Sequence, residues 1–196
     1  MRRVGDERGA SFVEFALIFP IFMTILLGMF SGGQSYNRKI SMSNAAGEAS
    51  RYGATLAPST QEASPSAGCT VVPPPSGLTC GLDQWVNAVA DAVVQNASGD
   101  LDANVTGRYI CVAYVHPALD TTGPHGQQSH RAVYAGGGAP VEDSGATARC
   151  FNDGRGDDEK RVQILVRRKS PIEALFFNAD VTLTARSVTR FEAESY

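Results

Sequence analysis

The residues best suited to chemistry are three histidines and a run of acids, and neither group has the spacing of a known site. Besides His116, the histidines are His125 and His130, five residues apart, whereas a metal pair on a helix needs a spacing of four. The run NDGRGDDEK at 152–160 offers oxygen ligands but lacks the spacing of a calcium-binding EF-hand loop. We predict a solvated turn there and no metal site.

Catalytic motifs are also missing from the sequence. It contains no GxSxG, no HExxH and no Walker-type glycine loop. The sequence therefore predicts neither an enzyme nor a bound cofactor.

One carboxylate occupies a chemically unusual place. Glu14 lies two residues inside an apolar run from Phe12 to Phe30, in which Thr24 is the other polar member. The 19 residues of this run would form a helix about 28 Å long, close to the ~30 Å hydrocarbon core of a bilayer. The run is too long for a cleaved signal peptide, and no A-x-A site follows it. We predict a transmembrane helix over residues 10–30.

An acid in lipid needs an explanation, because it costs roughly 2.5–3.5 kcal/mol at the bilayer centre and less near the interface. One interpretation is that Glu14 reaches the cytoplasmic boundary. The other is that the bond between Gly9 and Ala10 is cut, so that Ala10 gains a free amine. The Glu14 carboxylate, four residues later, would then lie near that amine or near the amine of a neighbouring copy.

Charge along the chain is uneven. The net charge is −3, with +2 over residues 1–52 and −5 over the remainder. There is no general basic field, so we predict no nucleic-acid partner. Three Arg lie in the first nine residues, which favours a cytoplasmic N-terminus and an extracytoplasmic body.

All four cysteines follow the apolar run: Cys69, Cys80, Cys111 and Cys150. No pair has CxxC spacing, and an even number in an exported domain favours two disulfides. Four cysteines allow three connectivities. We favour Cys69–Cys80 across the Pro-rich segment and Cys111–Cys150 across the later long loop.

The string GASFVEF at 9–15 resembles the processing site of type IV prepilins. The longer segment from Arg8 to Ala54, with VEFAL, Pro20, Gly28 and NAAGEASRYGA, resembles the TadE/TadF-like pseudopilins of tight-adherence (Flp) pilus systems. By this resemblance Gly9 ends the leader, Ala10 is the mature terminus, Glu14 is the membrane acid and Phe15 is the aromatic residue after it.

The resemblance implies a minor pilin or pseudopilin that acts in pilus assembly or priming, located either in the bacterial inner membrane or within the pilus. Its partners would be a prepilin peptidase, other pilins and the pilus assembly platform. Major Flp pilins are short, whereas this chain continues for about 140 residues beyond the helix, which argues against a shaft subunit. The alternative is a membrane-anchored extracytoplasmic enzyme or ligand-binding module unrelated to pili.

The remaining segments predict an α+β fold with an antiparallel sheet. The expected organisation is a leader at 1–9, the transmembrane helix at 10–30, its helical extension at 31–57 and an extracytoplasmic domain at 58–196. Within that domain we predict an amphipathic helix at 82–97 and a central strand at 107–117. We further predict a strand covered on one face at 161–169, a helical turn or connector at 170–177 and a closing strand at 181–192. Residues 118–160 are predicted to be an exposed loop insertion.

Overall fold

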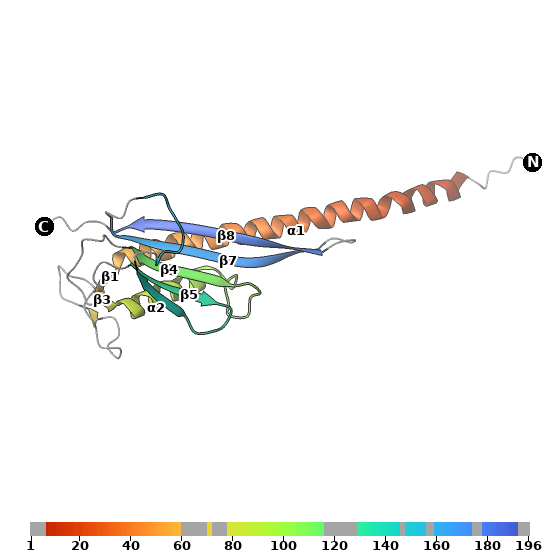
Figure 1. The fold of residues 1–196 in the computed structure, drawn as a ribbon. Helices are drawn as coiled ribbons and strands as arrows, with labels where there is room; N and C mark the ends of the chain where they lie inside the picture. Colours follow the sequence, from red (N-terminus) through yellow and green to blue (C-terminus); the bar gives the residue numbers. More distant parts are fainter. Residues whose placement is uncertain are drawn as a thin grey trace, which may run out of the picture. The chain divides into compact units, whose positions relative to one another are not determined.

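A computed structural model describes residues 7–59, 70–71, 78–115, 129–145, 148–155, 159–173 and 178–191. This part of the chain forms two helices and eight strands in two sheets, which confirms the predicted α+β class (Figure 1). The chain divides into two compact units. One comprises Met1–Arg38 with Ser170–Val181, and the other comprises Lys39–Lys169 with Thr182–Tyr196.

The helix α1 (Glu7–Thr55) confirms that the apolar run continues into a helical extension. Pro20 lies inside it, and the Thr24 hydroxyl donates a hydrogen bond of 2.8 Å to the Pro20 carbonyl oxygen. This bond satisfies the one hydroxyl of the apolar run locally, as is common for Thr in apolar helices. The helix ends at Thr55, one residue before the short strand β1 (Ala57–Ser59), which contains Pro58.

The helix α2 (Leu82–Asn96) is the amphipathic helix predicted from its apolar spacing. Its buried face carries Trp85, Val86, Val89 and Val93, each with no exposed surface. Ser98 and Gly99 follow the helix with positive φ angles of 50° and 83°, a conformation that commonly ends helices.

The larger sheet contains five strands in the order β6-β5-β4-β7-β8. Their bounds are β4 (Tyr109–Val115), β5 (Ser129–Ala135), β6 (Val141–Gly145), β7 (Arg161–Glu173) and β8 (Asn178–Arg190). β4 pairs antiparallel with both β5 and β7, and residues 110–115 are all buried. The prediction of a central strand is therefore confirmed. A smaller sheet has the order β1-β3-β2, with β2 (Thr70–Val71) and β3 (Leu78–Gly81).

The hydrophobic core of the second unit lies between one face of the larger sheet and two helical segments. Met42, Ala45, Ala46 and Ala49 of α1 join the buried face of α2 and the β4 and β7 side chains in one cluster. The indole Nε1 of Trp85 donates to the carbonyl oxygens of Gly53 and Leu56 at 3.0 and 3.1 Å. Trp85 therefore satisfies a carbonyl of the last turn of α1 as well as filling the core.

The structure differs from the prediction within residues 118–160. The expected loop insertion contains β5 and β6, which pair antiparallel with each other. Their sequences, SHRAVYA and VEDSG, are too polar to be recognised as strands. β5 forms by pairing with β4, and β6 by pairing with β5, despite their weak intrinsic preference, because strand preference depends strongly on tertiary context.

The prediction of a turn or connector at 170–177 is also wrong for its first half, because β7 continues through Pro171 to Glu173. Proline is tolerated there because the β4 ladder ends at the Tyr109–Arg167 pair, so the missing N–H interrupts no bond to β4. Residues 174–177 lie outside the described residues.

Candidate functional site

The apolar half of α1 exposes its side chains to a degree that a water-soluble surface does not tolerate. Between positions 12 and 30 the exposed large apolar residues are Phe12, Val13, Phe15, Leu17, Ile18, Phe19, Ile21, Phe22, Ile25, Leu26, Leu27, Met29 and Phe30. A continuous patch of this size marks a membrane or protein contact. In the part of the chain that the structure describes, one helix is long and apolar enough to cross a membrane, and it is this one. The chain therefore has the character of a single-pass membrane protein.

The structure places all four residues of the predicted processing site at the start of this helix. Gly9 and Ala10 follow Glu7 in the first turn of α1, and Glu14 lies one turn after Ala10. Phe15 is 61% exposed, and its ring lies 5.5 Å from that of Phe19, also one turn further on. Residues four apart in a helix share one face. Cleavage after Gly9 and pairing of Glu14 with an amine stay predictions.

Glu14 is exposed on this apolar surface. Among the residues that the structure describes, none forms a hydrogen bond or ion pair with its carboxylate. A carboxylate that enters lipid requires a compensating partner.

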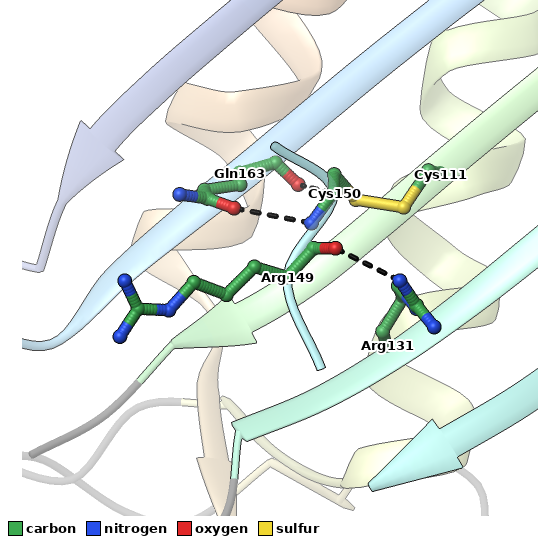
Figure 2. Close-up of a disulfide and its surroundings, with 5 residues drawn as sticks. All are labelled: Cys111, Arg131, Arg149, Cys150 and Gln163. Atoms are coloured by element: carbon green, nitrogen blue, oxygen red, sulfur yellow. Dashed lines mark hydrogen bonds between the residues drawn. A yellow bond between two sulfur atoms is a disulfide. The ribbon is translucent and has the colours of Figure 1, made fainter. Parts of the chain in front are cut away.

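Beside the disulfide Cys111–Cys150, in contrast, polar groups have hydrogen-bond partners within the chain (Figure 2). The S–S distance of this disulfide is 2.04 Å. This is one of the two pairs that we favoured; Cys69, of the other pair, lies outside the described residues. The disulfide joins central strand β4 to residues 148–155, which we call the clamped loop. Gln163 Oε1 accepts a bond from the Cys150 N–H at 3.2 Å, and Arg131 donates to the Arg149 carbonyl at 2.9 Å.

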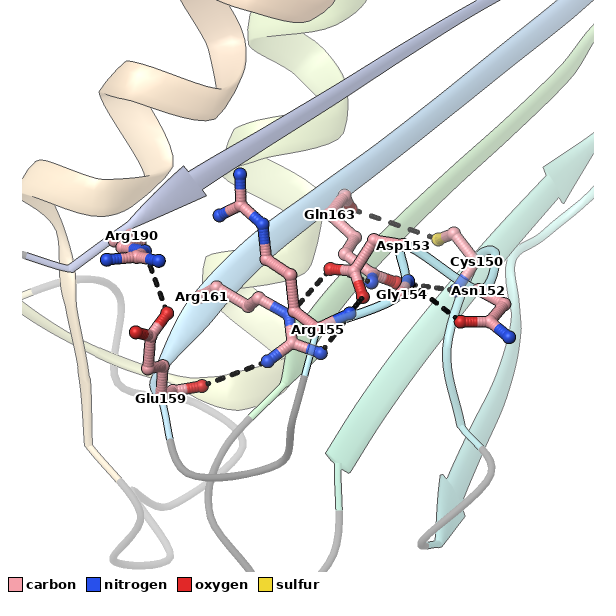
Figure 3. A network of polar contacts seen from close by, with 9 residues as sticks. All are labelled: Cys150, Asn152, Asp153, Gly154, Arg155, Glu159, Arg161, Gln163 and Arg190. Atoms are coloured by element: carbon pink, nitrogen blue, oxygen red, sulfur yellow. Dashed lines mark hydrogen bonds and ion pairs between the residues drawn. The ribbon is translucent and has the colours of Figure 1, made fainter.

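The clamped loop holds a buried ion pair over β7 (Figure 3). Arg161 Nε lies 2.8 Å from Asp153 Oδ2, and the two side chains are 0% and 4% exposed. The Gln163 amide donates to the same carboxylate at 3.0 Å, and the Arg155 N–H donates to it at 3.2 Å. The acidic run was predicted to be a solvated turn, which is wrong for Asp153. Asp157 and Asp158 lie outside the described residues.

The same loop explains why β7 is buried on both faces. We predicted cover on one face only, but residues 161–166 are all buried. Val162, Ile164 and Val166 belong to the core cluster, whereas Arg161 and Gln163 alternate with them toward the clamped loop. One feature of the sequence indicates this second buried face: Arg161 and Gln163 alternate with core positions, and several acids lie close to a cysteine. This signal acquires its meaning only once Cys150 is known to bond to Cys111.

Electrostatics at Asp153 favour the ionised form. Burial alone would raise the pKa of Asp153, but hydrogen bonds from Gln163 and Arg155 and the positive charge of Arg161 outweigh it. Together they lower the pKa of the carboxyl below its ordinary value. At neutral pH the pair is therefore ionised, and each charge has its partner inside the chain.

Within the described residues, no three His, Cys, Asp or Glu side chains are grouped so that they could hold a metal ion. His116 and His125 lie outside those residues, and His130 is in β5 with its side chain undescribed.

Comparison with known proteins finds a similarity in the N-terminal part of the chain. Residues 9–51 match the family model described as TadE-like protein. The match begins at Gly9 and covers the exposed apolar half of α1 and most of its continuation, which confirms the resemblance noted in the sequence. No curated protein and no solved structure matches the chain.

Proposed function

We propose that this protein is a minor pilin or pseudopilin that acts in the assembly or priming of a tight-adherence type IV pilus. The observation that carries the proposal is the TadE-like match over residues 9–51. This segment contains Glu14, an acid on an exposed apolar helix that has no partner among the described residues. Its partners are a prepilin peptidase, other pilins and the pilus assembly platform. Its location is the bacterial inner membrane.

The first step is removal of residues 1–9. Hydrolysis of the Gly9–Ala10 peptide bond adds one water and leaves a carboxylate on Gly9 and an ammonium on Ala10. This ammonium lies one helical turn from Glu14 in the same chain. In a bundle of such helices it can also approach the Glu14 carboxylate of a neighbour.

The second step is selection of axial register by charge. An unpaired Glu14 costs roughly 2.5–3.5 kcal/mol if the helix carries it to the bilayer centre, and pairing with an ammonium removes much of that cost. Helices that slide relative to one another by a turn would lose the pair. The exposed apolar side chains supply the contact area, and the Glu14–Ala10 pair supplies the register.

The disulfide supports an extracytoplasmic position for the body of the protein. Cys111–Cys150 joins the central strand to the clamped loop, and structural disulfides form in oxidising compartments. With the three arginines among the first nine residues, this supports a cytoplasmic N-terminus before cleavage.

The decisive experiment is intact-mass measurement of the protein purified from membranes that contain the prepilin peptidase. We expect a mature chain that starts at Ala10. Gly9→Val should block the cut, whereas Gly5→Val, at the other glycine of the predicted leader, should leave it unchanged. A wild-type chain that keeps residues 1–9 would contradict the proposal.

A further inference from the structure

Two adjacent glycines, Gly32 and Gly33, lie inside α1 just beyond the apolar run, and the helix continues through them. Glycine destabilises a helix interior more than any residue except proline, because ordering its backbone costs the most entropy. Sharp bends in long helices also occur at combinations of glycine and serine, and Ser31 directly precedes this pair. Residues 31–33 are therefore a weak point of α1.

Packing does not explain why glycine occupies these two positions. Both residues are exposed, and a Cβ built on either one would meet no neighbouring side chain or strand within 4 Å. Both have helical backbone, which alanine adopts more readily than glycine. Alanine would therefore fit at Gly32 and Gly33 without a clash or strain. The property that glycine adds here is backbone freedom.

The end of β7 is tied to α1 on both sides of the glycine pair. Before the pair, the Ser31 hydroxyl donates to the Glu173 carbonyl oxygen at 3.0 Å. After it, the hydroxyls of Ser35 and Ser170 lie 3.0 Å apart, and Arg38 donates to the Ser170 hydroxyl at 3.1 Å. All five residues belong to the same compact unit. The contacts therefore bracket the weak point of the helix.

The tied residues share one face of the helix. Ser31, Ser35 and Arg38 are spaced by four and then three residues, which places them on the same side of α1. Ser35 and Ser170 are 7% and 0% exposed, so their hydroxyls are shielded from water and use each other as partners. A bend at the glycines would separate Ser31 or Ser35 from its partner on β7, and a buried hydroxyl that loses its partner costs free energy. The end of β7 therefore opposes bending of the helix.

We propose that Gly32 and Gly33 form a hinge in α1 and that the end of β7 is a strap that holds this hinge in the helical state. When the contact between Ser35 and Ser170 opens, the freedom of the two glycines lets the helix unwind locally and change direction. In the proposed function the span moves between lipid and a bundle of neighbouring helices, and a hinge just beyond the span would let its direction follow the bundle. Only this use rests on the proposed function; the hinge and its strap depend on neither cleavage nor pilus assembly.

The test is amide hydrogen exchange, measured by mass spectrometry on the full-length protein in mild detergent. The informative amides are those of residues 34–37, which donate to the carbonyl groups of residues 30–33 and therefore report opening at the glycines. The strap variant is Ser35→Ala with Ser170→Ala, which removes both hydroxyls of the buried pair and leaves neither one unsatisfied.

The matched control is Ser41→Ala. The Ser41 hydroxyl donates to the Ala97 carbonyl oxygen at 3.3 Å, so this variant removes a serine contact of α1 away from the glycines. A second variant, Gly32→Ala with Gly33→Ala, removes the freedom of the hinge and leaves the strap intact.

We expect the strap variant to exchange the amides of residues 34–37 about tenfold faster, because a buried hydrogen bond contributes roughly this factor to local stability. Ser41→Ala should leave their exchange unchanged. The double glycine variant should slow exchange in the otherwise unmodified protein by roughly fivefold or more, because each alanine stabilises the helix. Combined with the strap variant, it should cancel the acceleration.

Exchange that the strap variant leaves unchanged would overturn the role of β7. Acceleration that persists after both glycines are replaced would overturn the hinge, because the added freedom would then come from elsewhere in the helix. The double glycine variant keeps the test decisive even where the strap variant folds poorly, since exchange that this variant does not slow would also overturn the hinge.

Discussion

Two regions of this molecule reverse the usual distribution of polar and apolar side chains. The first half of α1 exposes large apolar residues from Phe12 to Phe30. The clamped loop and β7 bury a charged pair, Asp153 and Arg161, whose side chains are 4% and 0% exposed. Each region also contains one carboxylate in an unusual environment, Glu14 in the helix and Asp153 in the loop.

The difference between the two carboxylates is where their partners are found. Asp153 receives bonds from Arg161, Gln163 and the Arg155 N–H, all within 10 residues of it in the sequence. Glu14 has no such partner among the described residues. We therefore expect Asp153 to stabilise the folded chain and Glu14 to act between chains. The predictions below test this separation, from the largest effect to the smallest.

The largest effect is expected at Glu14. Glu14→Ala removes the acid that would pair with an Ala10 amine, so pilus assembly should be lost although the protein still enters the membrane. The measurements are pilus number by electron microscopy and the amount of the variant in membranes. The matched control is Glu48→Ala, which removes an exposed acid of α1 whose pairing with Arg51, at 3.7 Å, is weak. Normal piliation by Glu14→Ala would contradict the proposed pairing.

The second effect is expected at Asp153. Asp153→Ala leaves the buried Arg161 charge without its carboxylate, which should lower the free energy of unfolding by about 3–5 kcal/mol. The measurement is denaturant unfolding of the full-length protein in mild detergent. Asp102→Ala, at an exposed acid of the same unit, should stay within about 0.5 kcal/mol of the unmodified protein. Equal losses for the two variants would show that burial of the pair is unimportant.

A smaller effect distinguishes two glycines of α1. A Cβ on Gly53 would lie 2.9 Å from Val89 Cγ2 and 3.2 Å from Trp85 Cζ2, both in the packed core, whereas Gly28 has nothing within 4 Å. Gly53→Ala should therefore cost about 1–3 kcal/mol by overpacking. Gly28→Ala should leave the unfolding free energy in detergent unchanged or slightly raised, because alanine favours the helix. A loss at Gly28 as large as that at Gly53 would place an unrecognised contact in the exposed half.

The smallest effect is a dependence of stability on pH. The pKa of Asp153 is lowered in the folded state, so the carboxylate contributes its full stability above the unfolded value of about 3.9. That contribution is lost as the pH falls through the lower folded pKa. The difference in unfolding free energy between the unmodified protein and Asp153→Asn should shrink as the pH is lowered from 6 to about 3. A difference that stays constant across this range would show that folding does not lower the pKa of Asp153.

Much of the fold could be predicted from local pattern. The apolar run, the spacing of apolar residues in α2 and the unbroken apolar stretch of β4 are each strong signals within a short window, and each predicted element is present. The strands β5 and β6 were missed because their residues are polar and small. β5 forms a strand because it pairs with the edge of β4, and β6 forms one because it pairs with β5. The sequence of β5 or β6 alone does not show that these partner strands are available.

The two candidate regions differ in the same way. The position of Glu14 is visible in the sequence because an acid among apolar residues is conspicuous. Asp153 looked like one of several solvated acids. The burial of Asp153 depends on the Cys111–Cys150 bond and on its contacts with Arg161 and Gln163 of β7. The pairing of β4 with β7 brings the disulfide and these two residues close together.

By itself the sequence determined the membrane helix, its likeness to TadE-like proteins and the acid near its start, because length, hydropathy and motif spacing are local properties of the chain. Only the tertiary structure decided which charges are buried and which part of the β7–β8 hairpin lies against α1. Those outcomes depend on contacts between residues more than a hundred positions apart, such as Ser35 with Ser170, and on a loop held by a disulfide. Contacts of this kind have no periodicity along the chain, so the folded arrangement is needed to reveal them.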